Sequence, residues 1–78
     1  MQERLLEKIE KLEKTIKEGM FVTKKGREPL IAQLTELLVE GFILTPISGQ
    51  KPHESAQRYL VYHGFIEKCV GGYQTVGL

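Results

Sequence analysis

The two histidines and the single cysteine are the residues best suited to bind a metal ion or to act as a base and a nucleophile. His53 and His63 stand ten residues apart, and Cys69 is the only thiol. Zinc sites use paired ligands at short spacings, which this arrangement does not provide. Cys69 precedes a valine in a β-favouring run, where a cysteine is typically a small buried hydrophobic residue. We therefore expect no metal, no cofactor and no catalytic residue.

Two further arrangements that support catalysis are also missing from the sequence. The segment KKGRE, at residues 24–28, has one glycine and no Ser or Thr, whereas a loop that cradles phosphate needs several glycines and a hydroxyl group. Most glutamates fall on the outer face of the first predicted helix, where a catalytic carboxylate pair is hard to assemble. The chain is therefore predicted not to be an enzyme.

Polar side chains around residues 51–62 have a different potential, which is contact with a nucleic acid or a protein. Gln57 can pair with both edge atoms of an adenine and Arg58 with those of a guanine, so both are candidates to read bases. Basic residues elsewhere would hold phosphate oxygens. The full set of candidate residues for a nucleic acid or a protein partner is Lys24, Lys25, Arg27, Lys51, His53, Gln57, Arg58, Tyr62, Lys68 and Tyr73.

The charge balance argues against strong attraction to nucleic acid. Eleven Lys and Arg residues stand against ten acidic residues, all of them Glu, which gives a net charge of +1. Most affinity for nucleic acid comes from neutralising phosphates. Val61, Tyr62 and Tyr73 would instead add apolar surface that suits a protein partner. Both kinds of partner stay open on the sequence alone.

Length and composition predict one small domain, residues 1–78, in the cytoplasm. A chain of 78 residues buries only a modest core, and a lone cysteine fits a reducing compartment. No apolar stretch reaches the roughly 18 residues that a membrane span needs. The charged N-terminus lacks the apolar centre of a signal peptide, so we expect no membrane association.

Residues 2–18 are predicted to form an amphipathic helix. Its apolar residues recur every three or four positions. They are Leu5, Ile9, Leu12 and Ile16. Glu13 stands four residues before Lys17, one of three favourable spacings for a pair of opposite charges. The stripe can pack within the domain or against a second copy, so residues 5–16 are also a candidate homodimer element.

One local signal occurs three times: a helix end, a glycine that permits a left-handed turn, and an apolar run. The glycines are Gly19, Gly41 and Gly64. The strands expected after them are residues 20–23, residues 42–45 and a run that opens at residues 65–66. The second helix is expected over residues 28–40, after a polar turn at 24–27, and the third over about residues 53–63.

The C-terminal residues resemble part of a known family. Two β-favouring runs flank Gly71-Gly72, which predicts a hairpin with this pair as its loop. Leu60-x-x-x-Gly64-x-Ile66 precedes the hairpin, and the pattern over about residues 28–76 resembles winged helix-turn-helix domains. The resemblance implies that the third helix enters the DNA major groove and that the hairpin, or wing, touches the DNA backbone or minor groove.

Two correspondences with that family are open. In the first, residues 29–40 are the first helix and 42–45 the first strand, so 46–52 must supply the second helix despite their two prolines. In the second, residues 2–18 are the first helix, 20–23 the first strand and 29–40 the second helix. The second correspondence preserves every element and is preferred.

The sequence thus predicts an α+β fold: three helices packed on a small, mostly antiparallel sheet that ends in a C-terminal β-hairpin, similar to a winged helix. Residues 2–18 would form the amphipathic helix and residues 20–76 the winged-helix-like remainder. We expect a small non-enzymatic regulator that binds a larger protein or protein complex as an adaptor or inhibitor. The alternative is a winged-helix transcriptional regulator that binds double-stranded DNA.

Overall fold

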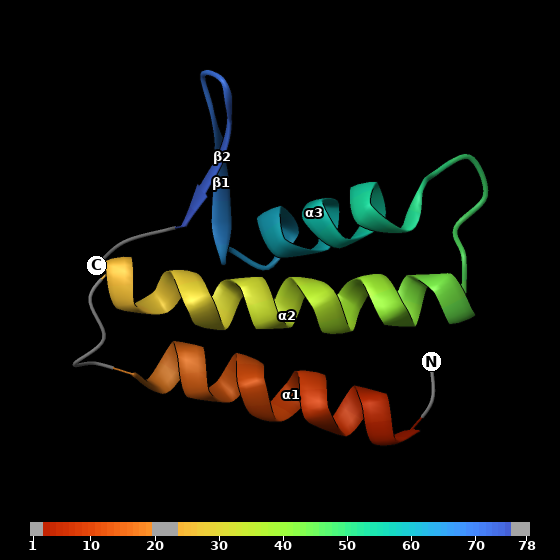
Figure 1. Ribbon diagram of the computed structural model, residues 1–78, viewed down its shortest axis with the longest axis horizontal. Helices are drawn as coiled ribbons and strands as arrows, with labels where there is room; N and C mark the ends of the chain where they lie inside the picture. The colour runs from red at the N-terminus through yellow and green to blue at the C-terminus, as the bar shows by residue number, and fades with distance from the viewer. Residues whose placement is uncertain (1–2, 20–23, 76–78) are drawn as a thin grey trace.

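A computed structural model of the chain describes residues 3–19 and 24–75, and every structural statement concerns these residues. Three helices are followed by a two-stranded antiparallel sheet (Figure 1). The elements are α1 (Glu3–Glu18), α2 (Lys24–Leu44), α3 (Pro52–Tyr62), β1 (Ile66–Cys69) and β2 (Gly72–Thr75). The predicted α+β class, with three helices and a C-terminal antiparallel hairpin, is confirmed.

The longest helix, α2, lies between α1 and α3, and the hairpin rises beyond the C-terminal end of α3 (Figure 1). β1 contacts α3 and β2 contacts α2, so the hairpin is attached to both helices. Leu34 and Leu38 of α2 are completely buried in the centre of the domain. Within the described ranges, no helix is both long enough and apolar enough to cross a membrane.

The apolar core takes side chains from all three helices and from the start of the hairpin. Its buried members are Leu5, Ile9, Ile16, Ile31, Leu34, Leu38, Ala56, Leu60, Phe65 and Ile66. The stripe of the first helix therefore packs within the domain, which was one of its two predicted uses. Homodimerisation through residues 5–16 stays a prediction. A second copy would have to contact the same apolar stripe that already packs against α2.

The N-terminal end of α2 differs from the prediction. Residues 24–27, predicted as a polar turn, form the first turn of the helix. Pro29 consequently lies inside α2, where it removes the hydrogen bond that its N–H would donate to the carbonyl of Lys25. The polar-turn prediction was wrong because Lys and Arg are good helix formers, and one lost backbone hydrogen bond does not prevent the extension.

The C-terminal end of α2 also differs from the prediction. Residues 42–45 were predicted as a strand, but the helix continues through Gly41 to Leu44. Leu34, Leu38 and Phe42 are spaced four residues apart, so a continuous helix places all three on one face. Phe42 packs against the core there. This packing outweighs the roughly 1 kcal/mol that a glycine costs in a helix interior.

These differences bear on the two correspondences with the winged-helix family. The first is excluded, because residues 42–44 are helical and residues 46–51 contain no helix. The second retains its helices and hairpin in the expected order. Its first strand, at residues 20–23, lies outside the described residues, and the family resemblance itself stays a prediction.

The C-terminal end of α3 is a Schellman motif that aims the chain into β1. The Phe65 N–H donates to the Leu60 carbonyl at 2.9 Å, and the Gly64 N–H donates to the Val61 carbonyl at 3.1 Å. Gly64 adopts a φ of 78°, which residues with a side chain rarely do. Leu60 and Phe65 are both buried, which supplies the apolar contact typical of this motif. Gly64 therefore ends α3, as predicted.

The hairpin is confirmed, but its loop lies one residue earlier than predicted. Cys69 pairs with Gly72, so the loop is Val70-Gly71 and not Gly71-Gly72. Gly71 provides the left-handed residue of the loop, with a φ of 88°, while Val70 keeps a negative φ. Gly72 begins β2 with a φ of 146°, which residues with a side chain also rarely adopt.

Candidate partner-binding surface

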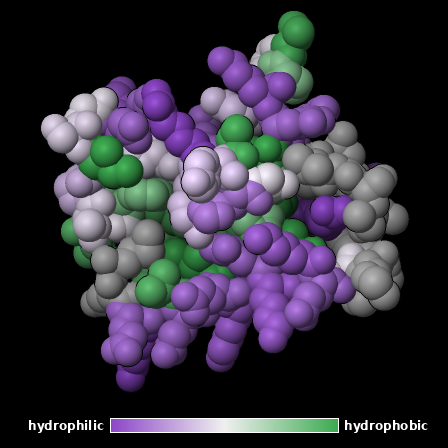
Figure 2. All heavy atoms as spheres, turned by 180° about the vertical axis from the view of Figure 1, so that it is seen from behind, coloured by the Kyte–Doolittle hydropathy of each residue, from purple (hydrophilic) through white to green (hydrophobic). Residues whose placement is uncertain are grey.

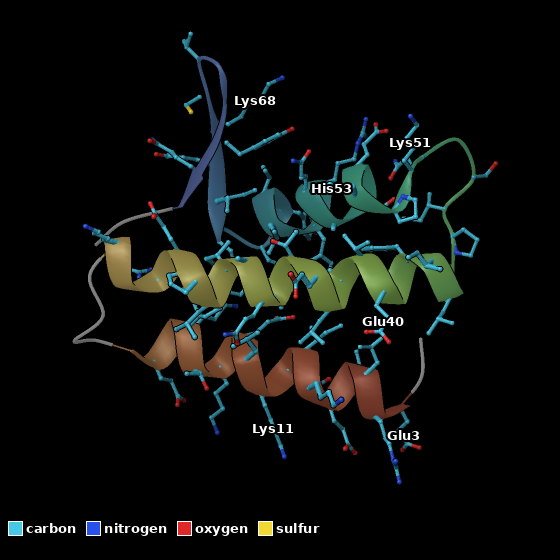
Figure 3. All side chains as sticks on the ribbon, viewed as in Figure 1. Glu3, Lys11, Glu40, Lys51, His53 and Lys68 are labelled. Carbon is cyan, nitrogen blue, oxygen red and sulfur yellow. The ribbon has the colours of Figure 1, made fainter. Side chains whose placement is uncertain are left out.

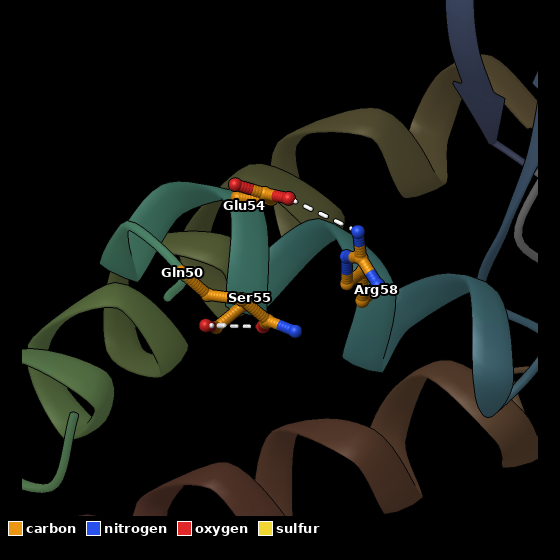
Figure 4. Close-up of polar contacts among 4 residues, drawn as sticks. All are labelled: Gln50, Glu54, Ser55 and Arg58. Carbon is orange, nitrogen blue, oxygen red and sulfur yellow. Dashed lines mark hydrogen bonds and ion pairs between the residues drawn. The ribbon is translucent and has the colours of Figure 1, made fainter. Parts of the chain in front are cut away.

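The N-terminal end of α3 is held by the loop before it. Gly49, with a φ of 81°, allows a turn in which the Gln50 N–H donates to the Ile47 carbonyl at 3.1 Å. The side chain of Ser55 then donates to Oε1 of Gln50 at 2.8 Å (Figure 4). Pro52 occupies the first turn of α3, where its missing N–H needs no partner. These contacts fix α3 against the loop after α2.

Three adjoining hollows cross the outer side of α3. The first, about 350 Å³, lies between α2, α3 and the hairpin; the second, about 310 Å³, lies between α3 and the hairpin; and the third, about 320 Å³, lies between α3 and the end of α2. Tyr73 lines the first two, while Arg58 and Tyr62 line the last two, so each hollow adjoins the next. We name this region the α3 surface. Its main side chains are Phe42, Ile47, His53, Gln57, Arg58, Val61, Tyr62, Lys68 and Tyr73.

Exposed apolar and aromatic side chains stand at the centre of the α3 surface. Tyr62 is 87% exposed, Tyr73 42% and Val61 38%. Tyr62 contacts the edge of the His63 ring, with 5.2 Å between the ring centroids. The opposite edge of the domain is different, because Figure 2 shows a band of hydrophilic side chains along its lower edge, where α1 lies.

The observed hairpin register contributes to this surface. Lys68 lies opposite Tyr73 in the strand pairing, and both line the hollow beside Tyr62. On the other strand face, Gln74 donates to the carboxylate of Glu67 at 2.6 Å. In the predicted register, Val70 would have stood opposite Tyr73 instead. Moving the loop by one residue therefore replaces Val70 by Lys68 as the cross-strand neighbour of Tyr73.

The charged residues of the α3 surface are few and exposed. Arg58 donates to Glu54, one helical turn earlier, at 3.1 Å (Figure 4). Lys68 makes no hydrogen bond or ion pair within the part of the chain that the structure describes. Lys51 and His53 project from the same side of the domain as α3, whereas Lys11 points away from it (Figure 3).

The structure brings most of the predicted site residues together and separates the others. Those that line the α3 surface are His53, Gln57, Arg58, Tyr62, Lys68 and Tyr73. Lys51 is exposed immediately before α3. Lys24, Lys25 and Arg27 belong to the first turn of α2, at the other end of that helix from the loop before α3. The ten candidates therefore do not form a single site.

Two residues of the surface were not predicted. Phe42 was assigned to a strand and Ile47 to a loop, yet both line the hollow beside Tyr62. The signal that could have found Phe42 is its spacing of four residues from Leu38, which continues the apolar face of α2. Ile47 carries no such signal, because its position depends on the turn that leads into α3.

The titratable side chains of the described residues include one with a clearly shifted pKa. Among the described residues, no group of three or more His, Cys or Glu side chains could hold a metal ion. The pKa of Tyr59 is raised above its ordinary value, first by burial and then by its hydrogen bond to Glu13. The raised pKa keeps this phenol protonated, so its hydroxyl remains the donor of the hydrogen bond that joins α3 to α1.

Fold and surface together define a small α+β domain with a hollowed, aromatic helix face. Comparisons of the chain with protein-family models, with curated proteins and with solved structures found no significant match. The surface chemistry of the domain is therefore the basis for a functional proposal.

Proposed function

We propose that this domain is a non-enzymatic regulator that binds a protein partner through the α3 surface, as an adaptor or an inhibitor. The observation that carries the proposal is Tyr62, which is 87% exposed on a helix and has a hollow on each side. An exposed tyrosine can bury a large apolar area on binding and loses little conformational entropy, because its side chain has few rotatable bonds. A side chain of the partner would fill each hollow, with Tyr62 between them.

The charges around Tyr62 indicate the polar chemistry of the partner. Lys68 lines the same hollow and has no partner within the described residues, so it is available to a carboxylate. The Arg58–Glu54 pair is exposed, with 64% and 46% of the side chains accessible, and exposed pairs contribute little stability. Arg58 can therefore exchange Glu54 for an acidic group. We expect the partner to present an apolar side chain beside an Asp or Glu.

The proposal is tested by comparing partners of the wild-type chain with those of Tyr62→Ala. The immobilised chain is exposed to extract from its source cells, and each retained protein is purified and titrated against both forms. Because residues at the centre of an interface dominate affinity, we expect Tyr62→Ala to raise the Kd of the true partner at least about tenfold.

Two controls make that comparison specific. Lys11→Ala changes a residue on the opposite edge of the domain, so it should leave the Kd unchanged (Figure 3). Circular dichroism should show the same helix content and Tm for both variants, because Tyr62 makes no core contact. If every purified candidate binds Tyr62→Ala as tightly as wild type, the α3 surface is not the binding face.

Double-stranded DNA is a second candidate partner, supported by the projection of Lys51, His53 and Lys68 from one side of the domain (Figure 3). The winged-helix resemblance would insert α3 into the major groove, with Arg58 near a base. Titration with a mixed-sequence duplex at about 50 and 200 mM salt tests this, because DNA binding must weaken steeply with salt. It should also weaken in Arg58→Ala. Absence of binding at the lower salt concentration rejects this candidate.

A further inference from the structure

A second cavity, separate from the α3 surface, lies where three parts of the chain meet. The end of α1, the start of α2 and the turn after α3 border a cavity of about 470 Å³ that is open to solvent on one side. The end of α1 and the start of α2 lie at the same end of the helix layer (Figure 1). Its described lining residues are Ile16, Lys17, Gly19, Arg27, His63, Gly64 and Phe65. We propose that this cavity binds a small organic anion, with a phosphate or carboxylate group attached to an apolar body.

Arg27 is the least exposed of the basic residues that line the cavity. Its Nε atom is excluded from solvent and has no hydrogen-bond partner among the described residues. A buried donor without a partner is costly, and most folded proteins avoid it. Arg27 lines the cavity, and a guanidinium group donates two parallel hydrogen bonds to a carboxylate or phosphate. The Nε atom itself does not reach the open space, so an anion in the cavity would bind the other nitrogens of this guanidinium.

Two other basic groups line the same cavity. Lys17 extends over the ring of Phe65, with Nζ 5.3 Å from the ring centroid, so its charge is held at the cavity wall. His63 borders the cavity from the end of α3. Its ring lies against that of Tyr59 at an angle of 38°, with centroids 4.1 Å apart. No glutamate is among the described lining residues, so the charged or titratable side chains among them are all basic.

The size and the apolar part of the lining define the rest of the ligand. A volume of about 470 Å³ falls within the range of small-molecule sites, roughly 300–1,000 Å³, and exceeds the need of an inorganic ion. Ile16 and Phe65 are both buried core residues whose side chains border the space. They would cover an aromatic or aliphatic body while the basic groups hold the anion.

The site is tested by NMR titration of the full chain with three probes of similar size: phenyl phosphate, benzoate and benzyl alcohol. At about 150 mM salt, surface charge attraction is largely screened. We expect at least one anion to cause saturable shifts at the amides of Gly64 and Phe65, and benzyl alcohol to cause none. The tighter anion identifies phosphate or carboxylate as the preferred group.

Matched variants assign the binding to this cavity. Arg27→Gln should weaken binding of the preferred anion at least about tenfold, because the charged bidentate donor is lost. Lys11→Gln makes the same change of charge on the outer side of α1 and should bind as wild type does (Figure 3). Lys17→Gln should also weaken binding, because Lys17 lines the cavity. Since Lys17 is exposed, this variant should fold, and it serves as the test if Arg27→Gln does not fold.

The remaining outcomes overturn the proposal. Equal binding of benzyl alcohol would show that the cavity is merely apolar. Equal weakening by Arg27→Gln and Lys11→Gln would show general charge attraction. No saturable shift with either anion, in a chain whose spectrum shows it to be folded, would show that the cavity does not bind this class of ligand.

Discussion

Tyr59 links the two outer helices of the domain through a single hydrogen bond. Its hydroxyl, on α3, donates to the carboxylate of Glu13, on α1, at 2.6 Å. We expect Tyr59→Phe to lower the free energy of unfolding by about 1–2 kcal/mol, because a partly buried hydrogen bond to a charged acceptor is lost. Urea denaturation at neutral pH measures the change. Tyr62→Phe also removes a tyrosine hydroxyl, but from an exposed ring without such a bond, so it should leave the free energy of unfolding unchanged.

Tyr59 should also make the free energy of unfolding depend on pH, and the sign of this dependence follows from its pKa. Burial and Glu13 raise the pKa of Tyr59 above the ordinary value of 10.0, so the folded state holds this proton more tightly than the unfolded state. The resulting stability is fully present below about pH 10 and is lost as pH rises toward the folded pKa. We therefore expect the stability difference between wild type and Tyr59→Phe to shrink above about pH 10. A difference that stays constant up to pH 11 would contradict the raised pKa.

Glu13 also shows why single contacts are hard to predict. Its spacing predicts an ion pair with Lys17, but Glu13 accepts a hydrogen bond from Tyr59, and Lys17 extends over Phe65. Spacing along one helix identifies only neighbours on that helix. Both observed partners lie on segments more than 40 residues away, which local patterns cannot reveal.

At the level of the elements, the two helical prolines should have opposite effects on stability. Pro29 removes a backbone hydrogen bond inside α2, whereas Pro52 stands in the first turn of α3, where no bond is lost. We expect Pro29→Ala to raise the free energy of unfolding by about 1–3 kcal/mol. Pro52→Ala should lower it by about 0.5–1 kcal/mol, because the unfolded chain gains freedom.

Chemical denaturation of both variants tests this contrast. If both substitutions change stability in the same direction, α2 does not contain Pro29 as described. A rise in helix content for Pro29→Ala, seen by far-ultraviolet circular dichroism, would support the explanation through the restored hydrogen bond.

Two glycines in similar sequence contexts have opposite outcomes. Gly64 ends α3, while Gly41 lies inside α2. Phe65 is buried because the chain reverses direction after α3. Phe42 packs against the core because the helix continues and places it four residues after Leu38 on the same face. The sequence predicts that each glycine permits a turn. Whether a turn forms depends on where the next aromatic residue can be buried, which is a tertiary property.

For the whole molecule, the apolar stripe of α1 should stabilise the domain within one chain. Ile9 is 1% exposed in the core, and Leu6 on the same helix is 44% exposed. We expect Ile9→Ala to cost about 2–5 kcal/mol and Leu6→Ala much less, because only the first leaves a cavity. Thermal denaturation and urea denaturation measure both.

The protein concentration provides the matching control. If the apolar stripe of α1 packs only within its own chain, the urea midpoint of wild type should not change over about a tenfold range of protein concentration. A midpoint that rises with concentration would instead support a homodimer through residues 5–16.

The sequence predicts the fold class and most of the α3 surface, because each depends on regular spacing along one helix or one hairpin. Arg58 and Tyr62 are four residues apart on α3, so their common face follows from helical geometry. The anion cavity does not follow in this way. Lys17, Arg27 and His63 come from three separate segments, and only the packing of α1 and α3 on α2 brings them together.

The hairpin loop offers a place to extend the molecule. Val70 is completely exposed at the loop, and the buried residues nearest to it in the chain are Phe65 and Ile66, at the base of β1. Surface loop tips are where inserted segments are best tolerated, and lengthening a loop has a small entropic cost. A short peptide tag or a fluorescent group inserted between Val70 and Gly71 would therefore lie at the far end of the hairpin, away from the core. Such an insertion would allow the domain to be attached to a support or detected by fluorescence.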